Sequence, residues 1–136
     1  MIYPTESQIQ CAFFDWVRLQ PKISPYCFHV PNGGYRNARE GAKFKREGVL
    51  SGIPDIVLAL PSKAYHGLFL ELKSRVGKLS KEQKSFLDRV RDVGYCAEVA
   101  RSVDEAIGIV TKYWMGFEPV SEEAQQDALE AIDFLV

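Results

Sequence analysis

The chain has 136 residues and a formal net charge of −1, and its length suits one compact domain. An apolar fraction of 46% is sufficient for a core and excludes a disordered chain. No stretch approaches the roughly 20 apolar residues of a membrane-spanning helix, and residues 1–10 lack the features of a secretory signal. Cys11, Cys27 and Cys96 form no CxxC pair and predict reduced, buried thiols, so we expect a cytoplasmic protein without a membrane partner.

The charge is divided unevenly along the chain. Residues 114–136 contain six Asp and Glu and no Lys or Arg, whereas residues 1–113 carry 17 Lys and Arg against 12 acids, a formal charge of +5. A basic body with an acidic tail is typical of proteins that bind nucleic acid, although a solvated surface with a solubilising tail shows the same division. We therefore divide the chain into a body, residues 1–113, and an acidic tail, residues 114–136, with an amphipathic helix expected over residues 121–134.

The first predicted element is a helix that begins after Thr5. Thr5 and Gln8 have the spacing of a capping box. Apolar residues then recur at helical spacing up to Val17, and Pro21 ends the helix. Glu6 lies on or next to this apolar stripe, where an acid needs a partner, although the helix dipole alone also favours an acid in the first turn.

The next segment combines a short strand with a basic helix. The strand is expected over residues 26–30, and a Pro-Asn-Gly-Gly loop follows over residues 31–34. A short polar helix is expected over residues 37–46 and ends at Gly48. The positive side chains of this region are Arg36, Arg39, Lys43, Lys45 and Arg46.

Strands and helices alternate in the second half of the body. An apolar strand is expected over residues 56–60, and an alternating strand over residues 68–73 has its leucines on one side. A helix over residues 80–93 begins with a capping box in which Gln83 faces inward. A last strand and a last helix of the body occupy residues 95–99 and 102–113. The order αβαββαβα predicts an α/β fold with a mixed sheet flanked by helices.

Three residues around the central strands have the chemistry of a metal-dependent site. Asp55 precedes the apolar strand, and Glu71 and Lys73 lie two residues apart on the next strand, so they share a face. If the two strands pair as a hairpin, Asp55 can approach both of them. Two neighbouring carboxylates repel each other unless a cation lies between them, and carboxylates with water ligands suit Mg²⁺ or Mn²⁺.

A lysine beside such an ion can orient or deprotonate a water that attacks phosphorus, or stabilise charge on the phosphoryl oxygens. The three residues therefore suit the hydrolysis of a phosphodiester. The alternative without catalysis is an ion pair between Glu71 and Lys73, with Asp55 capping a turn.

Further motifs surround this triplet. They are Glu6 with Gln10, the loop at residues 31–34, and the segments 45–55, 69–73, 79–83 and 94–106. Together these motifs resemble the PD-(D/E)xK nuclease superfamily and, within it, the VRR-NUC (virus-type replication-repair nuclease) domain. The resemblance extends over about residues 5–113, nearly the whole body, and excludes the acidic tail.

The resemblance implies a restriction-endonuclease-like fold and a role for each site residue. Asp55 and Glu71 would bind the metal, and Lys73 would be the catalytic lysine. Gln83 would approach the site from its helix as a positioning residue. Glu6 would correspond to the first-helix acid that helps to order the metal and its waters. The implied cofactor is Mg²⁺, with Mn²⁺ as a second ion that supports activity.

The resemblance also implies a partner. Short members of the family are associated with phages, act on branched double-stranded DNA in the manner of Holliday junction resolvases, and are expected to form homodimers in the cytoplasm of the bacterial host. Two active sites related by a two-fold axis suit the symmetric cuts of a four-way junction. Two alternatives stay open, namely a monomeric nuclease for flaps or ends and a DNA-binding module without catalysis.

The basic side chains near the site are expected to contact DNA phosphates, which gives salt-sensitive affinity without readout of the bases. We expect these contacts from Asn32, Arg36, Arg39, Lys43, Lys45, Arg46, Lys78 and Lys81. For His29, at a strand end, the alternatives are a packed side chain and a contact to DNA or to a metal.

Deletion of residues 118–136 is expected to tighten DNA binding at low salt, because it removes six negative charges from a chain whose body carries +5. A salt titration of DNA affinity, with the full chain beside the shortened one, measures this effect. The difference should shrink as ionic strength rises, since salt screens interactions between exposed charges. Equal affinities at every salt concentration would contradict the prediction.

Overall fold

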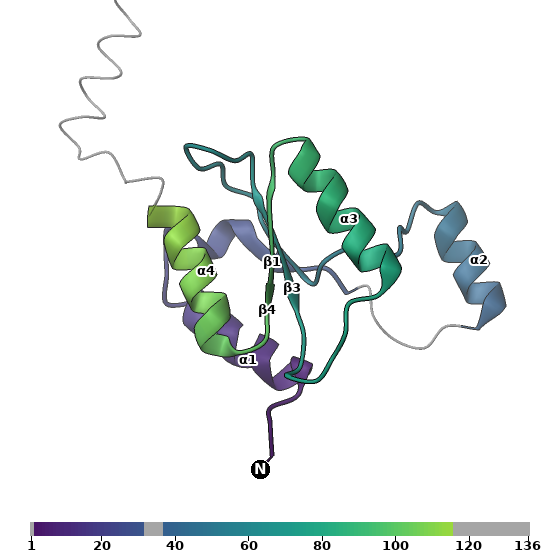
Figure 1. Ribbon diagram of the computed structural model, residues 1–136, viewed down its shortest axis with the longest axis horizontal. Helices are drawn as coiled ribbons and strands as arrows, with labels where there is room; N and C mark the ends of the chain where they lie inside the picture. The colour runs from purple at the N-terminus through teal and green to yellow at the C-terminus, as the bar shows by residue number, and fades with distance from the viewer. Residues whose placement is uncertain (1, 32–36, 116–136) are drawn as a thin grey trace, which may run out of the picture.

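The computed structural model describes residues 2–31 and 37–115, which form one four-stranded mixed sheet with helices on both faces (Figure 1). Strands β1 (Cys27–His29), β2 (Ile56–Leu58) and β3 (Leu68–Leu72) pair antiparallel in chain order, and β4 (Cys96–Ala100) pairs parallel to β3. The element order and the mixed sheet confirm the predicted α/β architecture.

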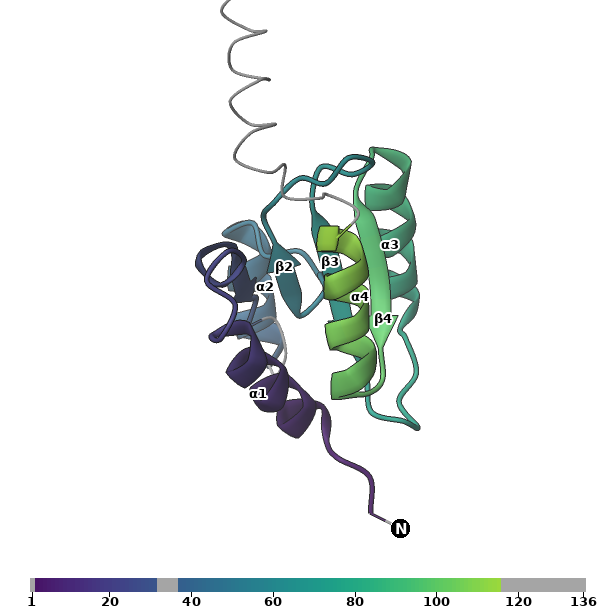
Figure 2. The same cartoon turned by 90° about the vertical axis from the view of Figure 1, so that its left-hand side faces the viewer.

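The helices divide between the two faces of the sheet. Helices α1 (Glu6–Val17) and α4 (Val103–Met115) contact each other on one face, and α3 (Lys81–Asp92) covers the other face (Figure 2). Helix α2 (Ala38–Arg46) stands apart from the sheet (Figure 1). A 3-10 turn, η1 (Ser24–Tyr26), leads into β1. Within the described residues no helix is long and apolar enough to cross a membrane.

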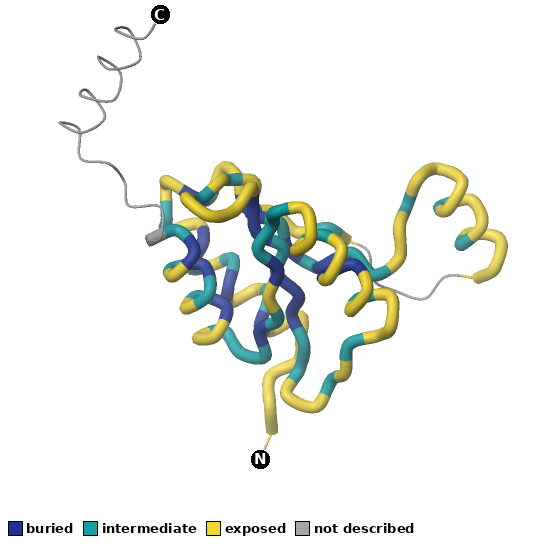
Figure 3. Tube along the Cα trace, turned by 45° about the horizontal axis from the view of Figure 1, so that its top comes forward, coloured by how far each residue is buried: buried dark blue, intermediate teal, exposed yellow. Residues whose placement is uncertain are grey.

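The alternation of β3 positions the core and the site on opposite sides of one strand. Leu68, Leu70 and Leu72 are buried in one cluster with apolar residues of α1 and α4. The side chain of Phe69 points to the other face, where its ring meets Phe86 of α3 at 5.3 Å between centroids. Glu71 and Lys73 have the same parity as Phe69 and therefore belong to the α3 side. Figure 3 shows the buried positions along the strands and inner helix faces, with α2 largely exposed.

Several predicted boundaries and one predicted burial differ from the structure. Strand β2 ends at Leu58 rather than at residue 60, and the carbonyl of Leu60 accepts a hydrogen bond from the Tyr113 hydroxyl at 2.6 Å. Helix α4 runs two residues past Tyr113. Cys11 is exposed on α1, so the prediction of three buried thiols was wrong there. The helix expected over residues 121–134 lies outside the described residues.

Candidate active site

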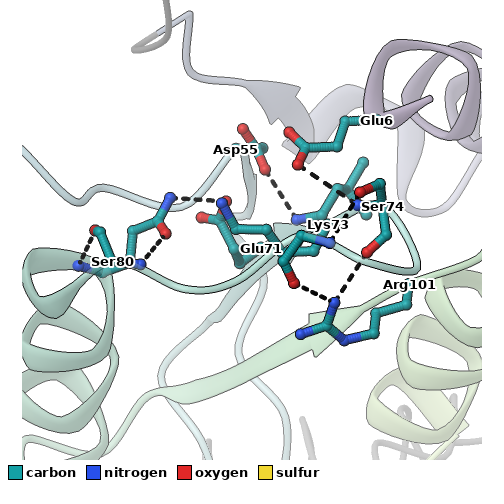
Figure 4. Close-up of polar contacts among 10 residues, drawn as sticks. Glu6, Asp55, Glu71, Lys73, Ser74, Ser80 and Arg101 are labelled. Carbon is teal, nitrogen blue, oxygen red and sulfur yellow. Dashed lines mark hydrogen bonds and ion pairs between the residues drawn. The ribbon is translucent and has the colours of Figure 1, made fainter.

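The predicted triplet meets at one end of the sheet. Strands β2 and β3 pair with Ile56 opposite Leu70, which places Asp55 opposite Glu71. Asp55 is held there because its Oδ2 accepts a hydrogen bond from the backbone N–H of Leu72 at 2.8 Å. Lys73 follows β3, and its Nζ lies 4.0 Å from Glu71 Oε1 (Figure 4). The hairpin pairing on which the prediction depended is therefore present.

Glu71 is the single buried charged residue of the described chain, with 2% of its surface exposed. Its Oε1 accepts a hydrogen bond from Gln83 Nε2 at 3.2 Å. Its Oε2 is buried and has no hydrogen-bond partner. A buried carboxylate oxygen without a partner costs about 1–3 kcal/mol or more when it is charged, so this atom is the one most in need of a ligand.

The pKa of Glu71 is raised to about 9, first by burial and then by the neighbouring Asp55 carboxyl. Glu6 adds a smaller repulsion, and the Lys73 ammonium acts in the opposite sense. The pair of carboxyls therefore holds a proton at neutral pH in the absence of a cation. A divalent cation between Asp55 and Glu71 would replace that proton and satisfy the free Oε2.

The donor set fits a hard divalent cation such as Mg²⁺. Two carboxylates converge, and Mg²⁺ prefers oxygen ligands and retains several waters. In the part of the chain that the structure describes, no group of three His, Cys, Asp or Glu forms a complete cage. Asp55 and Glu71 would therefore hold the ion, and waters or substrate oxygens would complete its coordination.

Gln83 combines two functions in one side chain. Ser80 and Gln83 form the predicted capping box of α3: Ser80 Oγ accepts from the Gln83 N–H at 3.1 Å, and Gln83 Oε1 accepts from the Ser80 N–H at 2.8 Å. With its Oε1 fixed in this way, the Nε2 of Gln83 points at Glu71. The structure therefore brings Gln83 to the site in the inward orientation that the sequence predicts.

Glu6 lies at the rim of the site rather than on Glu71. It is exposed, and its Oε1 accepts from the backbone N–H of Ser74 at 3.5 Å. A Cβ added to Gly77 would lie 3.4 Å from the same oxygen. Glu6 thus contacts the turn that follows Lys73, from where its charge still reaches Glu71.

Sequence reasoning assigned no role to Arg101, although its guanidinium holds that same turn. Its Nη1 donates to the carbonyls of Ser74 at 2.9 Å and Gly77 at 2.6 Å (Figure 4). Because the turn begins directly after Lys73, Arg101 fixes the backbone that carries the lysine. In the sequence, the available signal was that Arg101 falls within one of the motifs shared with the family. The contact of its side chain with the turn is explained only by the parallel pairing of β3 and β4.

The loop before Asp55 packs against the start of α3 through Gly52. Its φ is +83°, and an added Cβ would lie 2.5 Å from the backbone oxygen of Glu82, next to Gln83. Gly48 has a similar φ of +96° but open space around it, so it is a matched control. Both positions favour glycine because L side chains are strained there.

We expect Gly48→Ala to destabilise the fold by about 1–2 kcal/mol, the cost of left-handed backbone alone. Gly52→Ala should cost a further 1–3 kcal/mol or so, because the loop must move away from α3. Urea unfolding of the two variants measures the difference. Equal losses would show that the contact between Gly52 and Glu82 does not hold the loop.

The predicted DNA contacts fall into three groups. Asn32 and Arg36 lie outside the described residues. The side chains of α2 project from an exposed helix, which Asn37 caps by accepting from the Glu40 N–H at 2.8 Å; they are Arg39, Lys43, Lys45 and Arg46. Lys78 and Lys81 are exposed at the start of α3, on the Gln83 side of the site.

Comparisons with known proteins agree with this geometry. The family model of the VRR-NUC domain matches residues 4–104. A solved structure described as a "VRR_NUC domain protein" is 30% identical, with a TM-score of 0.75, and the match covers 85% of this chain and 92% of that chain. No curated protein matches the chain.

The mixed sheet and the Asp55, Glu71 and Lys73 triplet at its end define a nuclease domain of the PD-(D/E)xK type. Within that superfamily, the chain belongs to the VRR-NUC family.

Proposed function

We propose that the protein is a Mg²⁺-dependent, structure-specific endonuclease that hydrolyses phosphodiester bonds in branched double-stranded DNA, in the manner of a Holliday junction resolvase. The observation that carries this proposal is the buried Oε2 of Glu71, which has no hydrogen-bond partner and belongs to a carboxyl group next to that of Asp55. A protein that only bound DNA would gain nothing from clustered acids beside the phosphates.

Each site residue has a distinct task in this reaction. Asp55 and Glu71 bind the ion, which supplies Lewis acidity to the phosphoryl group when it is bound. Gln83 fixes one oxygen of Glu71 and leaves the other for the ion. Lys73, whose side chain is 12% exposed, stabilises charge on the phosphoryl oxygens or orients the attacking water. Mn²⁺ should replace Mg²⁺, since both prefer oxygen ligands.

The basic side chains supply affinity for the DNA backbone. Lys78 and Lys81 stand beside the site at the start of α3, and α2 extends the positive surface outward. Contacts to phosphates of this kind position the duplex without reading its sequence. Asn32 and Arg36 complete the proposed set. A homodimer would present two such sites, which suits the paired cuts of a four-way junction.

The proposal is tested by comparing cleavage rates on a labelled four-way junction, a flap and a linear duplex in Mg²⁺. Paired symmetric nicks in the junction, with 5′-phosphate and 3′-hydroxyl ends, are the expected result. Cleavage of only the flap or the duplex end would favour the alternative function, a monomeric nuclease that acts on flaps or ends. Tight binding without cleavage in Mg²⁺ or Mn²⁺ would overturn the proposal in favour of a non-catalytic DNA-binding module.

A further inference from the structure

A surface hollow of about 320 Å³ lies between α1 and β1. It is lined by Gln10, Cys11, Phe14, Arg18 and His29. None of the residues assigned to catalysis or to the basic surface takes part in it.

One residue of the hollow, His29, and the residue that follows it are hydrogen-bonded to the backbone of Asp55. The Nδ1 of His29 donates to the backbone carbonyl of Asp55 at 2.8 Å, since a carbonyl oxygen only accepts. The N–H of Val30 donates to the same carbonyl at 2.7 Å. One wall of the hollow is thus bonded to the residue that carries a metal-binding carboxylate.

The other wall is a stripe along α1 that starts at the active site. Glu6, Gln10, Phe14 and the C-cap residue Arg18 follow each other at intervals of four residues, so each lies about 6 Å along the helix axis from the one before and next to it on the helix surface. The stripe changes from an acid at the site to an amide, an aromatic ring and a guanidinium. Both of the polar groups beyond Glu6 can donate hydrogen bonds to an anion.

No acid lines the hollow itself. Asp15, next to it on α1, pairs with Arg18 at 3.2 Å, but the two side chains are 79% and 70% exposed. Exposed ion pairs of this kind contribute little, so a phosphate can compete with Asp15 for the guanidinium. The hollow is therefore suited to a phosphodiester.

We propose that this hollow is a subsite for the DNA backbone next to the scissile phosphate, with the Gln10 amide and the Arg18 guanidinium as donors. The inference rests on the proposed function, because DNA bound at Asp55 and Glu71 would have to pass Glu6, at the rim of the site, to reach the hollow on the α1 side of the sheet. Lys81, the first residue of α3, belongs to the other face of the sheet, so the two flanks of the cut would be held from opposite faces.

Cys11 provides a reporter inside the hollow. It is exposed, whereas Cys27 is buried with its pKa raised to about 11 by burial, and burial also raises the pKa of Cys96. Maleimide should therefore modify Cys11 first, and Cys11→Ser should remove the fast phase. The experiment measures this rate in the full, metal-free chain, alone and with saturating four-way junction DNA, while fluorescence anisotropy of the DNA reports binding.

Bound DNA is expected to slow the modification of Cys11 by about tenfold or more, since a covered thiol is inaccessible to the reagent. Arg18→Ala should weaken DNA binding about 3–10-fold, as expected for one phosphate contact, and Arg18→Lys should restore most of the loss. Lys112→Ala, an exposed cation in the last turn of α4, should change affinity less than about twofold.

Bound DNA with an unchanged Cys11 rate, or equal effects of Arg18→Ala and Lys112→Ala, would overturn the subsite. Cleavage assays with Mg²⁺ on the same samples separate this result from the proposed function. Protection of Cys11 without cleavage would overturn the proposed reaction and support the subsite. Cleavage without protection would overturn the subsite alone, and a complete absence of DNA binding would overturn both.

Discussion

Replacement of Lys73 by alanine is expected to lower the rate of DNA cleavage by about 10²–10⁴-fold, the usual contribution of a positioned charge or proton-transfer group. The ammonium lies 4.0 Å from Glu71 Oε1 and is largely enclosed, so water does not replace it well. Because Asp55 and Glu71 keep their positions, Mg²⁺ should still stabilise the variant. The expected result is therefore a loss of rate without a loss of the metal site.

Single-turnover cleavage of the junction at saturating enzyme measures this effect without a contribution from product release. Lys63→Ala is the matched control, because Lys63 is exposed in the connection between β2 and β3 at the far end of the sheet. The control should cleave at the rate of the unmodified chain. Cleavage by Lys73→Ala within a few-fold of that rate would remove the lysine from the mechanism.

The second large effect is expected for Glu71→Gln, which removes the buried charge and keeps the shape. The folded-state pKa of Glu71 is raised from 4.5 to about 9, chiefly by burial and then by Asp55. A group whose pKa is raised on folding stabilises the folded state fully at pH values below its pKa in the unfolded chain. This contribution is lost as the pH rises through its pKa in the folded chain. The metal-free chain should therefore lose stability between about pH 5 and 9, with a slope of at most about 1.4 kcal/mol per pH unit.

Glu71→Gln should lack this slope, since an amide does not titrate. Urea unfolding in EDTA at pH 6 and pH 9 measures the two slopes, with the exposed Glu98→Gln as the control that keeps the slope of the unmodified chain. Saturating Mg²⁺ should stabilise the unmodified chain by about 2.7 kcal/mol at one hundred times its dissociation constant, and should not stabilise Glu71→Gln. Parallel slopes in both chains would show that Glu71 does not carry the buried charge.

Much of the site could be predicted because it depends on local pattern. The period of two along β3 separates the leucines of the core from Glu71 and Lys73. The capping box fixes Gln83 at the start of α3, so its orientation follows from the four residues 80–83 of the sequence. The approach of Asp55 to Glu71 required only that neighbouring strands pair as a hairpin.

The contacts that sequence reasoning missed join residues far apart in the chain. Arg101 reaches carbonyls 24 and 27 residues away, and His29 reaches a carbonyl 26 residues away. In sequence, each side chain follows or ends a short strand and has no local partner that would reveal its role. Gly52 is similar, because its glycine requirement comes from Glu82 of α3 as well as from its own backbone angle.

The rim position of Glu6 has the same origin. Helical spacing predicted Glu6 on or beside the buried stripe, but Glu6 is the first residue of α1 and is exposed. Its carboxylate therefore meets the turn after Lys73 and remains exposed. An acid at this position can reach a substrate or an ion only from outside the buried pair.

The central claim is that the partnerless oxygen of Glu71 marks a metal site that cleaves DNA. The most direct measurement is the cleavage of a labelled four-way junction by the full chain in Mg²⁺ and in EDTA, beside Glu71→Gln under the same conditions. We predict paired nicks by the unmodified chain in Mg²⁺ alone, and none in EDTA or with Glu71→Gln. Cleavage that persists in EDTA or in the variant, or its absence on every DNA tested in Mg²⁺ and Mn²⁺, would contradict the claim.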